Sequence, residues 1–194
     1  KGANMPKDTI ERTIKKASGA DGTSYEEVTF EGYASNGVAV FVECTTDNNN
    51  RTVANIRATF SKYGGNLGTN GSLEFIFDRK GVFAIALENM DLEMEEFEME
   101  LIDAGLEEIE KEDDIILVYT DFADFSAMQK KLEELRIEVH SAELQRIPTT
   151  SKTLGVDKSK SVLKMIDKFE DDEDVQHVFH NMGLTDEILK VMEE

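Results

Sequence analysis

Alternation of apolar and polar residues near the start of the chain predicts two β-strands, over residues 26–33 and 37–44. The dipeptide Asn36-Gly37 between them favours a tight turn, because asparagine and glycine both tolerate a positive φ angle. A third strand is predicted over residues 72–78. These three strands indicate a sheet whose covering elements must come from elsewhere in the chain.

An amphipathic helix is predicted between the second and third strands, with Asp47 or Asn48 as its N-cap and its end near Tyr63. Its apolar face consists of Val53, Ile56 and Phe60. Four glycines follow the helix, at positions 64, 65, 68 and 71. They precede a strand rather than a helix, and they lack the Gly-Lys-Ser/Thr sequence of a phosphate-binding P-loop. We therefore interpret them as a helix C-cap followed by turns.

The next segment has the hydrophobic pattern of a β-α-β-β-α-β unit. Its predicted strands cover residues 82–87, 107–111, 114–119 and 138–146, and its predicted helices cover residues 93–104 and 123–135. This order is that of the ferredoxin-like split βαβ fold. The rest of the chain predicts a helix, a strand and a short helix, over residues 158–170, 174–180 and 185–192.

These elements predict an α+β protein with two ferredoxin-like α/β lobes, the second inserted in the first. The strands within residues 26–78 lack covering elements, which the C-terminal helices and strand can supply. The first domain is therefore expected to be discontinuous, made of residues 20–80 and 152–194. The inserted domain is expected to cover residues 81–151.

A short helix is also predicted over residues 6–17, with Pro6 at its first position and one narrow apolar stripe formed by Ile10, Ile14 and Ala17. We interpret residues 1–19 as the end of an N-terminal helical domain. Residue 1 is lysine rather than methionine, so the chain is expected to begin inside a longer protein.

Charge is distributed unevenly along the chain, whose formal net charge is −20. Residues 1–80 are neutral, residues 81–147 carry −15 and residues 148–194 carry −5. Because an acidic surface repels phosphate, we expect nucleic acid to contact residues 1–80 and the acidic segment to face solvent or a basic protein. The candidate contacts are basic residues on predicted helices and at a strand end: Lys7, Arg12, Lys15, Lys16, Arg51, Arg57, Lys62, Arg79 and Lys80.

The residue pattern offers no catalytic site, metal site or cofactor site. Cys44 is the only cysteine and lies in an apolar run, which is typical of a buried thiol. His177 and His180 are predicted to point to opposite faces of one strand, so they would not bind a metal together. The acidic runs 93–112 and 171–174 are interpreted as solvated faces. We therefore predict no enzymatic activity, no cofactor and no metal.

The chain contains no apolar run approaching the ~20 residues of a membrane-spanning helix, and no signal peptide. We therefore expect a cytoplasmic protein with no membrane partner.

Four separated blocks of sequence carry a resemblance to a known family. They are residues 3–12 (Ala-Asn-Met-Pro-Lys-Asp-Thr-Ile-Glu-Arg), residues 46–52 (Thr-Asp-Asn-Asn-Asn-Arg-Thr) with 64–68 (Gly-Gly-Asn-Leu-Gly), residues 77–81 (Phe-Asp-Arg-Lys-Gly) and residues 172–181 (Asp-Glu-Asp-Val-Gln-His-Val-Phe-His-Asn). In this order they resemble the YebC/PmpR family. The resemblance implies an N-terminal helical domain, of which this chain lacks most, followed by two α/β lobes. It implies no catalytic residue.

The resemblance leaves two functions open. Bacterial members are described as probable DNA-binding transcriptional regulators, which would make this chain a non-enzymatic regulator of gene expression. Other members, including the mitochondrial translational activator of cytochrome c oxidase subunit I, are tied to translation. A ribosome-associated factor that contacts ribosomal RNA and basic ribosomal proteins is therefore the alternative, and the uneven charge suits it. An enzyme on a ferredoxin-like scaffold is a third hypothesis, which no residue pattern favours.

Overall fold

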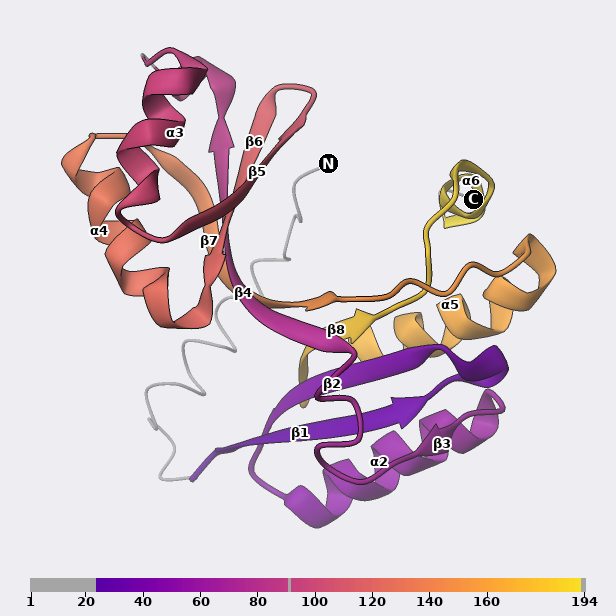
Figure 1. Cartoon of the computed structure of the whole chain (residues 1–194). Helices are drawn as coiled ribbons and strands as arrows, with labels where there is room; N and C mark the ends of the chain where they lie inside the picture. The colour runs from indigo at the N-terminus through magenta and orange to yellow at the C-terminus, as the bar shows by residue number, and fades with distance from the viewer. Residues whose placement is uncertain (1–23, 91, 193–194) are drawn as a thin grey trace. The chain divides into compact units, whose positions relative to one another are not determined.

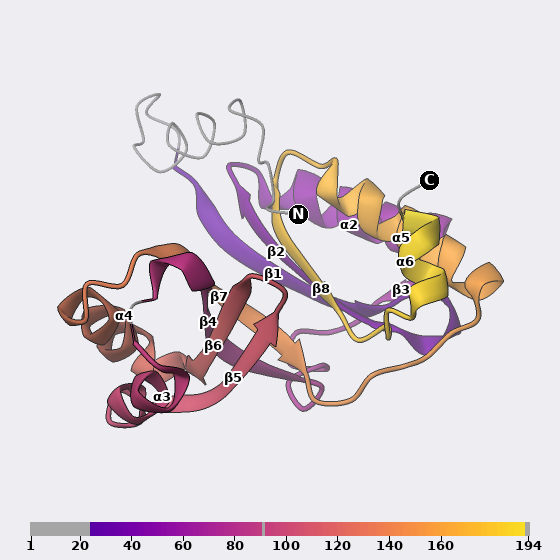
Figure 2. The ribbon, with the colours of Figure 1, turned by 90° about the horizontal axis from the view of Figure 1, so that it is seen from above.

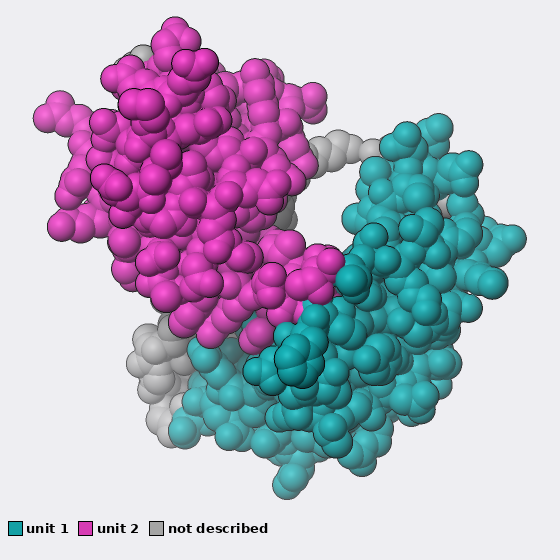
Figure 3. All heavy atoms as spheres, in the orientation of Figure 1, with its two compact units in different colours: residues 1–76, 150–194 teal, residues 77–149 magenta. Residues whose placement is uncertain are grey.

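The fold comes from a computed structural model that describes residues 24–90 and 92–192 (Figure 1). The helix predicted over residues 6–17, with Lys7, Arg12, Lys15 and Lys16, lies outside the described residues. The chain divides into two compact units (Figure 3). Unit 1 comprises the residues up to Ile76 together with those from Thr150 onward, and unit 2 comprises Phe77–Thr149.

Unit 1 contains a four-stranded antiparallel sheet with the strand order β3-β1-β2-β8. Its strands are β1 (Glu26–Tyr33), β2 (Ala39–Thr46), β3 (Asn66–Leu67) and β8 (Val175–His180). Its α-helices are α2 (Asn49–Lys62), α5 (Val156–Glu170) and α6 (Asp186–Met192). Helices α2 and α5 lie together on one face of the sheet (Figure 2).

The hairpin of β1 and β2 confirms the predicted turn. Asn36 and Gly37 have φ angles of 62° and 74°, and the Ala34 N–H donates to the Val38 carbonyl at 2.8 Å. In β2 the side chains of Val40, Val42 and Cys44 are buried against the two helices. These helices contribute a pair of rings, Phe60 and Phe169, whose centroids are 5.0 Å apart.

The glycines after α2 end the helix in a Schellman motif, as the C-cap interpretation expects. The Gly65 N–H donates to the Phe60 carbonyl, and the Gly64 N–H donates to the Ser61 carbonyl. Gly64 has a φ angle of 77°, a conformation that glycine adopts without steric strain. A Cβ at Gly65 would lie 2.4 Å from the Tyr33 carbonyl oxygen, so the chain can approach β1 only because this residue is glycine.

The segment after β3 corrects the prediction of a strand over residues 72–78. Residues 70–76 form turns, and only from Phe77 does the chain become the long strand β4 (Phe77–Ala86) of unit 2. A buried carboxylate accounts for the turns: Glu31 of β1 accepts from the Gly71 N–H at 2.7 Å and from the Leu73 N–H at 2.6 Å. Leu73 is fully buried, so this segment covers part of the sheet of unit 1.

Unit 2 is a ferredoxin-like domain with a four-stranded antiparallel sheet in the order β5-β6-β4-β7. Besides β4, its elements are α3 (Met94–Ile102), β5 (Leu106–Glu112), β6 (Ile115–Asp121), α4 (Phe125–Glu134) and β7 (Val139–Pro148). Both helices cover the same face of the sheet (Figure 1). Phe83, Phe97 and Met128 are fully buried between the layers.

The expectation of an α+β fold with two lobes is therefore confirmed, and most predicted elements begin and end within two residues of the observed ones. The split βαβ order is that of unit 2. In unit 1 the sheet is instead built from a hairpin, a short edge strand and a strand contributed from beyond unit 2. Among the described residues, no helix is long and apolar enough to cross a membrane.

Candidate functional site

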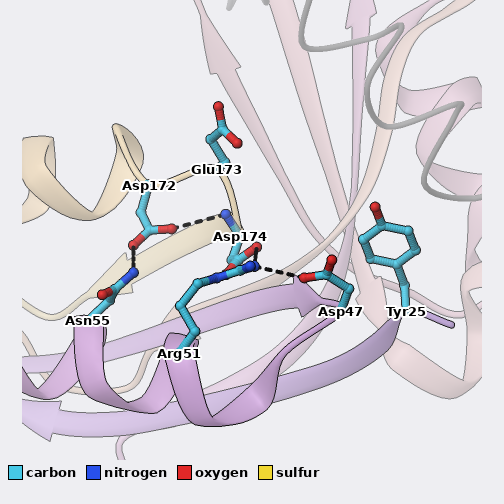
Figure 4. Close-up of a pocket in the computed structure, with 7 residues that line it drawn as sticks. All are labelled: Tyr25, Asp47, Arg51, Asn55, Asp172, Glu173 and Asp174. Atoms are coloured by element: carbon cyan, nitrogen blue, oxygen red, sulfur yellow. Dashed lines mark hydrogen bonds and ion pairs between the residues drawn. The ribbon is translucent and has the colours of Figure 1, made fainter. Parts of the chain in front are cut away.

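A polar pocket of about 470 Å³ lies in unit 1 where α2 begins (Figure 4). Three parts of the chain meet there: the residue before β1, the start of α2, and the turn between α5 and β8. The lining residues are Tyr25, Asp47, Arg51, Asn55, Asp172, Glu173 and Asp174. Two of the sequence blocks that carried the family resemblance, residues 46–52 and 172–181, thus lie side by side.

The start of α2 is fixed by short-range hydrogen bonds that its sequence encodes. The Asn48 side chain caps the helix by accepting from the Arg51 N–H at 3.1 Å, and the Asn48 N–H donates to the Thr46 hydroxyl at 2.9 Å. Asn48 rather than Asp47 is therefore the N-cap. Thr52 takes the first buried position of the helix, and Val53, predicted for the core face, is only half-buried.

Asp174 joins the turn before β8 to the start of α2 (Figure 4). Its carboxylate accepts from the Arg51 Nη2 at 3.0 and 2.9 Å, one bond to each oxygen. The hydroxyls of Thr52 and Thr46 lie 2.9 and 3.3 Å from Asp174 Oδ2. Asp174 is only 4% exposed, so the interpretation of residues 171–174 as a solvated face was wrong for this residue. A buried carboxylate requires such partners, because it gives up its hydration.

Arg51 is held by carboxylates on two sides. Its Nη2 also donates to Asp47 Oδ1 at 2.8 Å, one helical turn away. The hydrogen bond to Asp174, followed by that to Asp47, raises the pKa of Arg51 above its ordinary value. The charge of this candidate phosphate ligand is thus already offset within the protein.

The remaining lining residues make the pocket acidic. Asp172 accepts from the Asn55 Nδ2 at 3.4 Å and from the Asp174 N–H at 3.0 Å. With Asp47 and Glu173 the lining includes four carboxylates against one guanidinium, so the pocket disfavours phosphate. The described residues contain no group of three or more His, Cys, Asp or Glu side chains arranged to hold a metal ion.

The structure separates the other candidate basic residues into two groups. Arg57 and Lys62 are exposed along α2 in unit 1. Arg79 and Lys80 belong to β4 in unit 2, where the Arg79 guanidinium stacks 3.9 Å from the centre of the Phe122 ring and Lys80 forms an ion pair with Glu107. The five candidates among the described residues are therefore divided between the two units.

Residues 25–182 match a protein family described as TACO1/YebC second and third domain. The chain belongs to the TACO1/YebC family. The resemblance to YebC/PmpR proteins is thereby confirmed, and the matched region contains every residue that lines the pocket.

TACO1/YebC relatives match nearly the whole chain. A protein of Cytophaga hutchinsonii is 54% identical over 96% of this chain and 77% of its own length. A protein of Sulfurimonas denitrificans is 50% identical over 94% of this chain and 77% of its own length. Both are named "probable transcriptional regulatory protein". The crystal structure of a conserved hypothetical protein from Aquifex aeolicus matches with a TM-score of 0.76 and 35% identity, over 96% of this chain and 77% of that one.

In this TACO1/YebC chain, α5 carries exposed lysines that are not among the basic residues predicted to contact nucleic acid. Lys160, Lys164 and Lys168 follow one another at intervals of four residues, which places them on one exposed side of the helix. Lys160 and Lys168 each lie 3.7 Å from an aspartate of the same segment, Asp157 and Asp171. The net charge of −5 over residues 148–194 concealed this pattern, although the periodicity of the lysines could have indicated it.

His180 at the end of β8 supports a pH-dependent prediction. Its Nδ1 accepts from the Met182 N–H at 3.2 Å, and burial lowers the pKa of its imidazole. Between this lowered pKa and the ordinary value of about 6.5, the unfolded chain binds more protons, so stability falls as the pH falls. We expect the stability of the native protein relative to His180→Gln to decrease from about pH 7.5 to about pH 5.5, by less than about 1.4 kcal/mol per pH unit. Denaturant unfolding across this range measures it, and a constant difference would contradict it.

Proposed function

We propose that this chain is a non-enzymatic regulator of transcription that associates with nucleic acid through unit 1. The proposal rests on one observation above all: proteins about half identical to nearly the whole chain are named as probable transcriptional regulatory proteins. Sequence similarity at this level over both units supports a shared biochemical role. Fold alone would not support it, because ferredoxin-like domains serve many functions.

The exposed side of the α2–α5 layer is the part of unit 1 best suited to phosphate. The two helices run antiparallel, because Asn55 meets Asp172 beyond the end of α5 and the Ser161 hydroxyl donates to the Tyr63 carbonyl at 3.1 Å. The second of these contacts brings the last turn of α2 beside the first half of α5. Lys62 is exposed in the last turn of α2, Lys164 is exposed three residues after Ser161, and Arg57 is exposed on α2 five residues before Lys62. We assign the phosphate contacts to these three side chains.

Unit 2 is a poor surface for nucleic acid, even though ferredoxin-like sheets can bind RNA on their open face. Along β5, Glu108, Glu110 and Glu112 alternate with the half-buried Ile109, so their carboxylates lie on the face opposite the core. Tyr119 of β6 donates to Glu110 at 2.9 Å, and burial followed by this hydrogen bond raises the pKa of its phenol. A nucleobase stacking there would meet a row of negative charges.

A salt titration of the whole chain tests the assignment. Binding of a fluorescent DNA duplex is expected to weaken with salt, and the variant Arg57→Ala/Lys62→Ala should reduce the slope of log K against log salt concentration by about 1.8, or 0.9 for each lost phosphate contact. The control Lys111→Ala/Lys130→Ala removes the same charge from exposed positions of unit 2 and should leave the slope nearly unchanged. Equal slopes for both variants would remove α2 from the interface.

Crosslinking in cells, with sequencing of both DNA and RNA partners, tests the function itself. Recovery of specific DNA regions is the expected result. Recovery of ribosomal RNA alone would replace the proposal with the ribosome-associated alternative, and recovery of neither would overturn an association with nucleic acid.

A further inference from the structure

Helix α3 of unit 2 exposes two large apolar side chains to solvent. Met99 is 70% exposed and Ile102 is 62% exposed, although the same helix buries Phe97 and Leu101 completely. Met99 and Ile102 are three residues apart and therefore neighbours on the helix surface. They form a ridge on the side opposite the core, which we call the α3 ridge.

Carboxylates surround the α3 ridge. The nine residues of α3 include four glutamates and no basic residue. Glu95 and Glu98 stand one turn before Met99 and Ile102, on the same side of the helix. Glu100 instead faces α4, where it forms an ion pair with Lys131. The whole of unit 2 has 21 acidic and seven basic residues over positions 77–149, a net charge of −14.

We propose that the α3 ridge docks a basic amphipathic helix of a partner protein. Three classes of macromolecule accept an exposed apolar ridge: nucleic acid, lipid bilayers and proteins. The negative charge of unit 2 repels the phosphates of nucleic acid and the anionic lipids that bind peripheral proteins. It attracts a protein segment rich in lysine and arginine, which leaves a protein as the partner whose chemistry fits.

The spacing of the ridge defines what the partner helix must carry. Apolar side chains at intervals of three or four residues would pack on Met99 and Ile102, and flanking lysines or arginines would reach Glu95 and Glu98. Methionine suits such contacts because its flexible thioether adapts to differently shaped partners. This docking surface belongs to unit 2, whereas the proposed phosphate contacts belong to unit 1, and it does not depend on nucleic acid. It therefore goes beyond the proposed function.

A pair of synthetic peptides tests the proposal on the whole chain. One peptide of leucine and lysine places leucine at helical spacing, and the other has the same composition in scrambled order. We expect the amphipathic peptide to bind about tenfold more tightly by calorimetry, with amide NMR shifts concentrated on α3. If the scrambled peptide binds equally well, the attraction is only general charge and the docking site is wrong.

Variants locate the site on the ridge. Met99→Ser/Ile102→Ser changes only exposed side chains and should weaken the amphipathic peptide about tenfold. Leu184→Ser/Leu189→Ser, which alters two exposed apolar residues of unit 1, should not weaken it. Likewise Glu95→Gln/Glu98→Gln should weaken binding more than Glu133→Gln/Glu138→Gln, which removes the same charge from exposed positions elsewhere in unit 2. Equal effects within either pair of variants would overturn the proposal. None of these measurements requires the protein to bind DNA, so the outcome is independent of the proposed function.

Discussion

Replacing Asp174 with alanine is expected to destabilise unit 1 by about 3 kcal/mol. The substitution removes the acceptor of the Thr46 hydroxyl, one of the acceptors of the Thr52 hydroxyl and one of the carboxylates that hold Arg51. Hydrogen bonds to a buried charge contribute about 1.5–3 kcal/mol, and an unsatisfied buried donor adds a further penalty. The expected result is thus among the larger effects of a single substitution.

Guanidinium unfolding followed by circular dichroism measures the effect of Asp174→Ala, and amide hydrogen exchange assigns it to a unit. Protection should fall in β2, α2 and β8 and remain in unit 2. Asp171→Ala is the matched control, because that side chain is 71% exposed and pairs with Lys168 across 3.7 Å. Its effect should stay within about 0.5 kcal/mol. Similar losses from both substitutions would show that the Asp174 network does not stabilise the fold.

Glu31→Ala is expected to destabilise the same unit by about 2–3 kcal/mol. Without the carboxylate, the N–H groups of Gly71 and Leu73 lose their acceptor. The Leu73 side chain in this segment is fully buried. Each buried N–H left without an acceptor costs about 1–3 kcal/mol, and water entering the vacated space recovers part of this.

Hydrogen exchange again provides the measurement for Glu31→Ala, through faster exchange of residues 68–76 and of the pairing between β1 and β3. Glu27→Ala is its control: Glu27 lies on the same side of β1 but is exposed, so its removal should change stability by less than about 0.5 kcal/mol. An undisturbed turn segment in Glu31→Ala would mean that Leu73, rather than the carboxylate, holds it in place.

Local patterns predicted the elements of this protein well because they depend on neighbouring residues. Asn36-Gly37 specifies its turn through backbone conformation, and the period of Phe97 and Leu101 marks the buried side of α3. The prediction of a strand over residues 72–78 was wrong for residues 72–76, because hydrogen bonds to a residue distant in the sequence hold this segment in turns. Leu73 lies in one of these turns, and its N–H donates to the carboxylate of Glu31, 42 residues earlier in the chain.

The candidate site was less predictable for the same physical reason. Asp174 resembles its acidic neighbours in sequence, and only the fold brings it to Arg51, 123 residues away. Which of the basic residues have their charge offset depends on contacts such as that between Lys80 and Glu107, which the sequence does not reveal. The negative net charge of residues 148–194 also concealed the lysines of α5, which lie on one side only because the segment is helical.

The discontinuity of unit 1 sets an order of events during synthesis. All strands and helices of unit 2 lie within Phe77–Thr149, so that unit can fold as soon as β7 leaves the ribosome. Unit 1 begins earlier in the chain, yet its sheet and core need α5 and β8, which emerge later. The inserted unit should therefore be the first to fold. Until α5 and β8 have been synthesised, the apolar face of the hairpin of β1 and β2 remains uncovered. In that interval the nascent hairpin is the segment most exposed to aggregation and most in need of a chaperone.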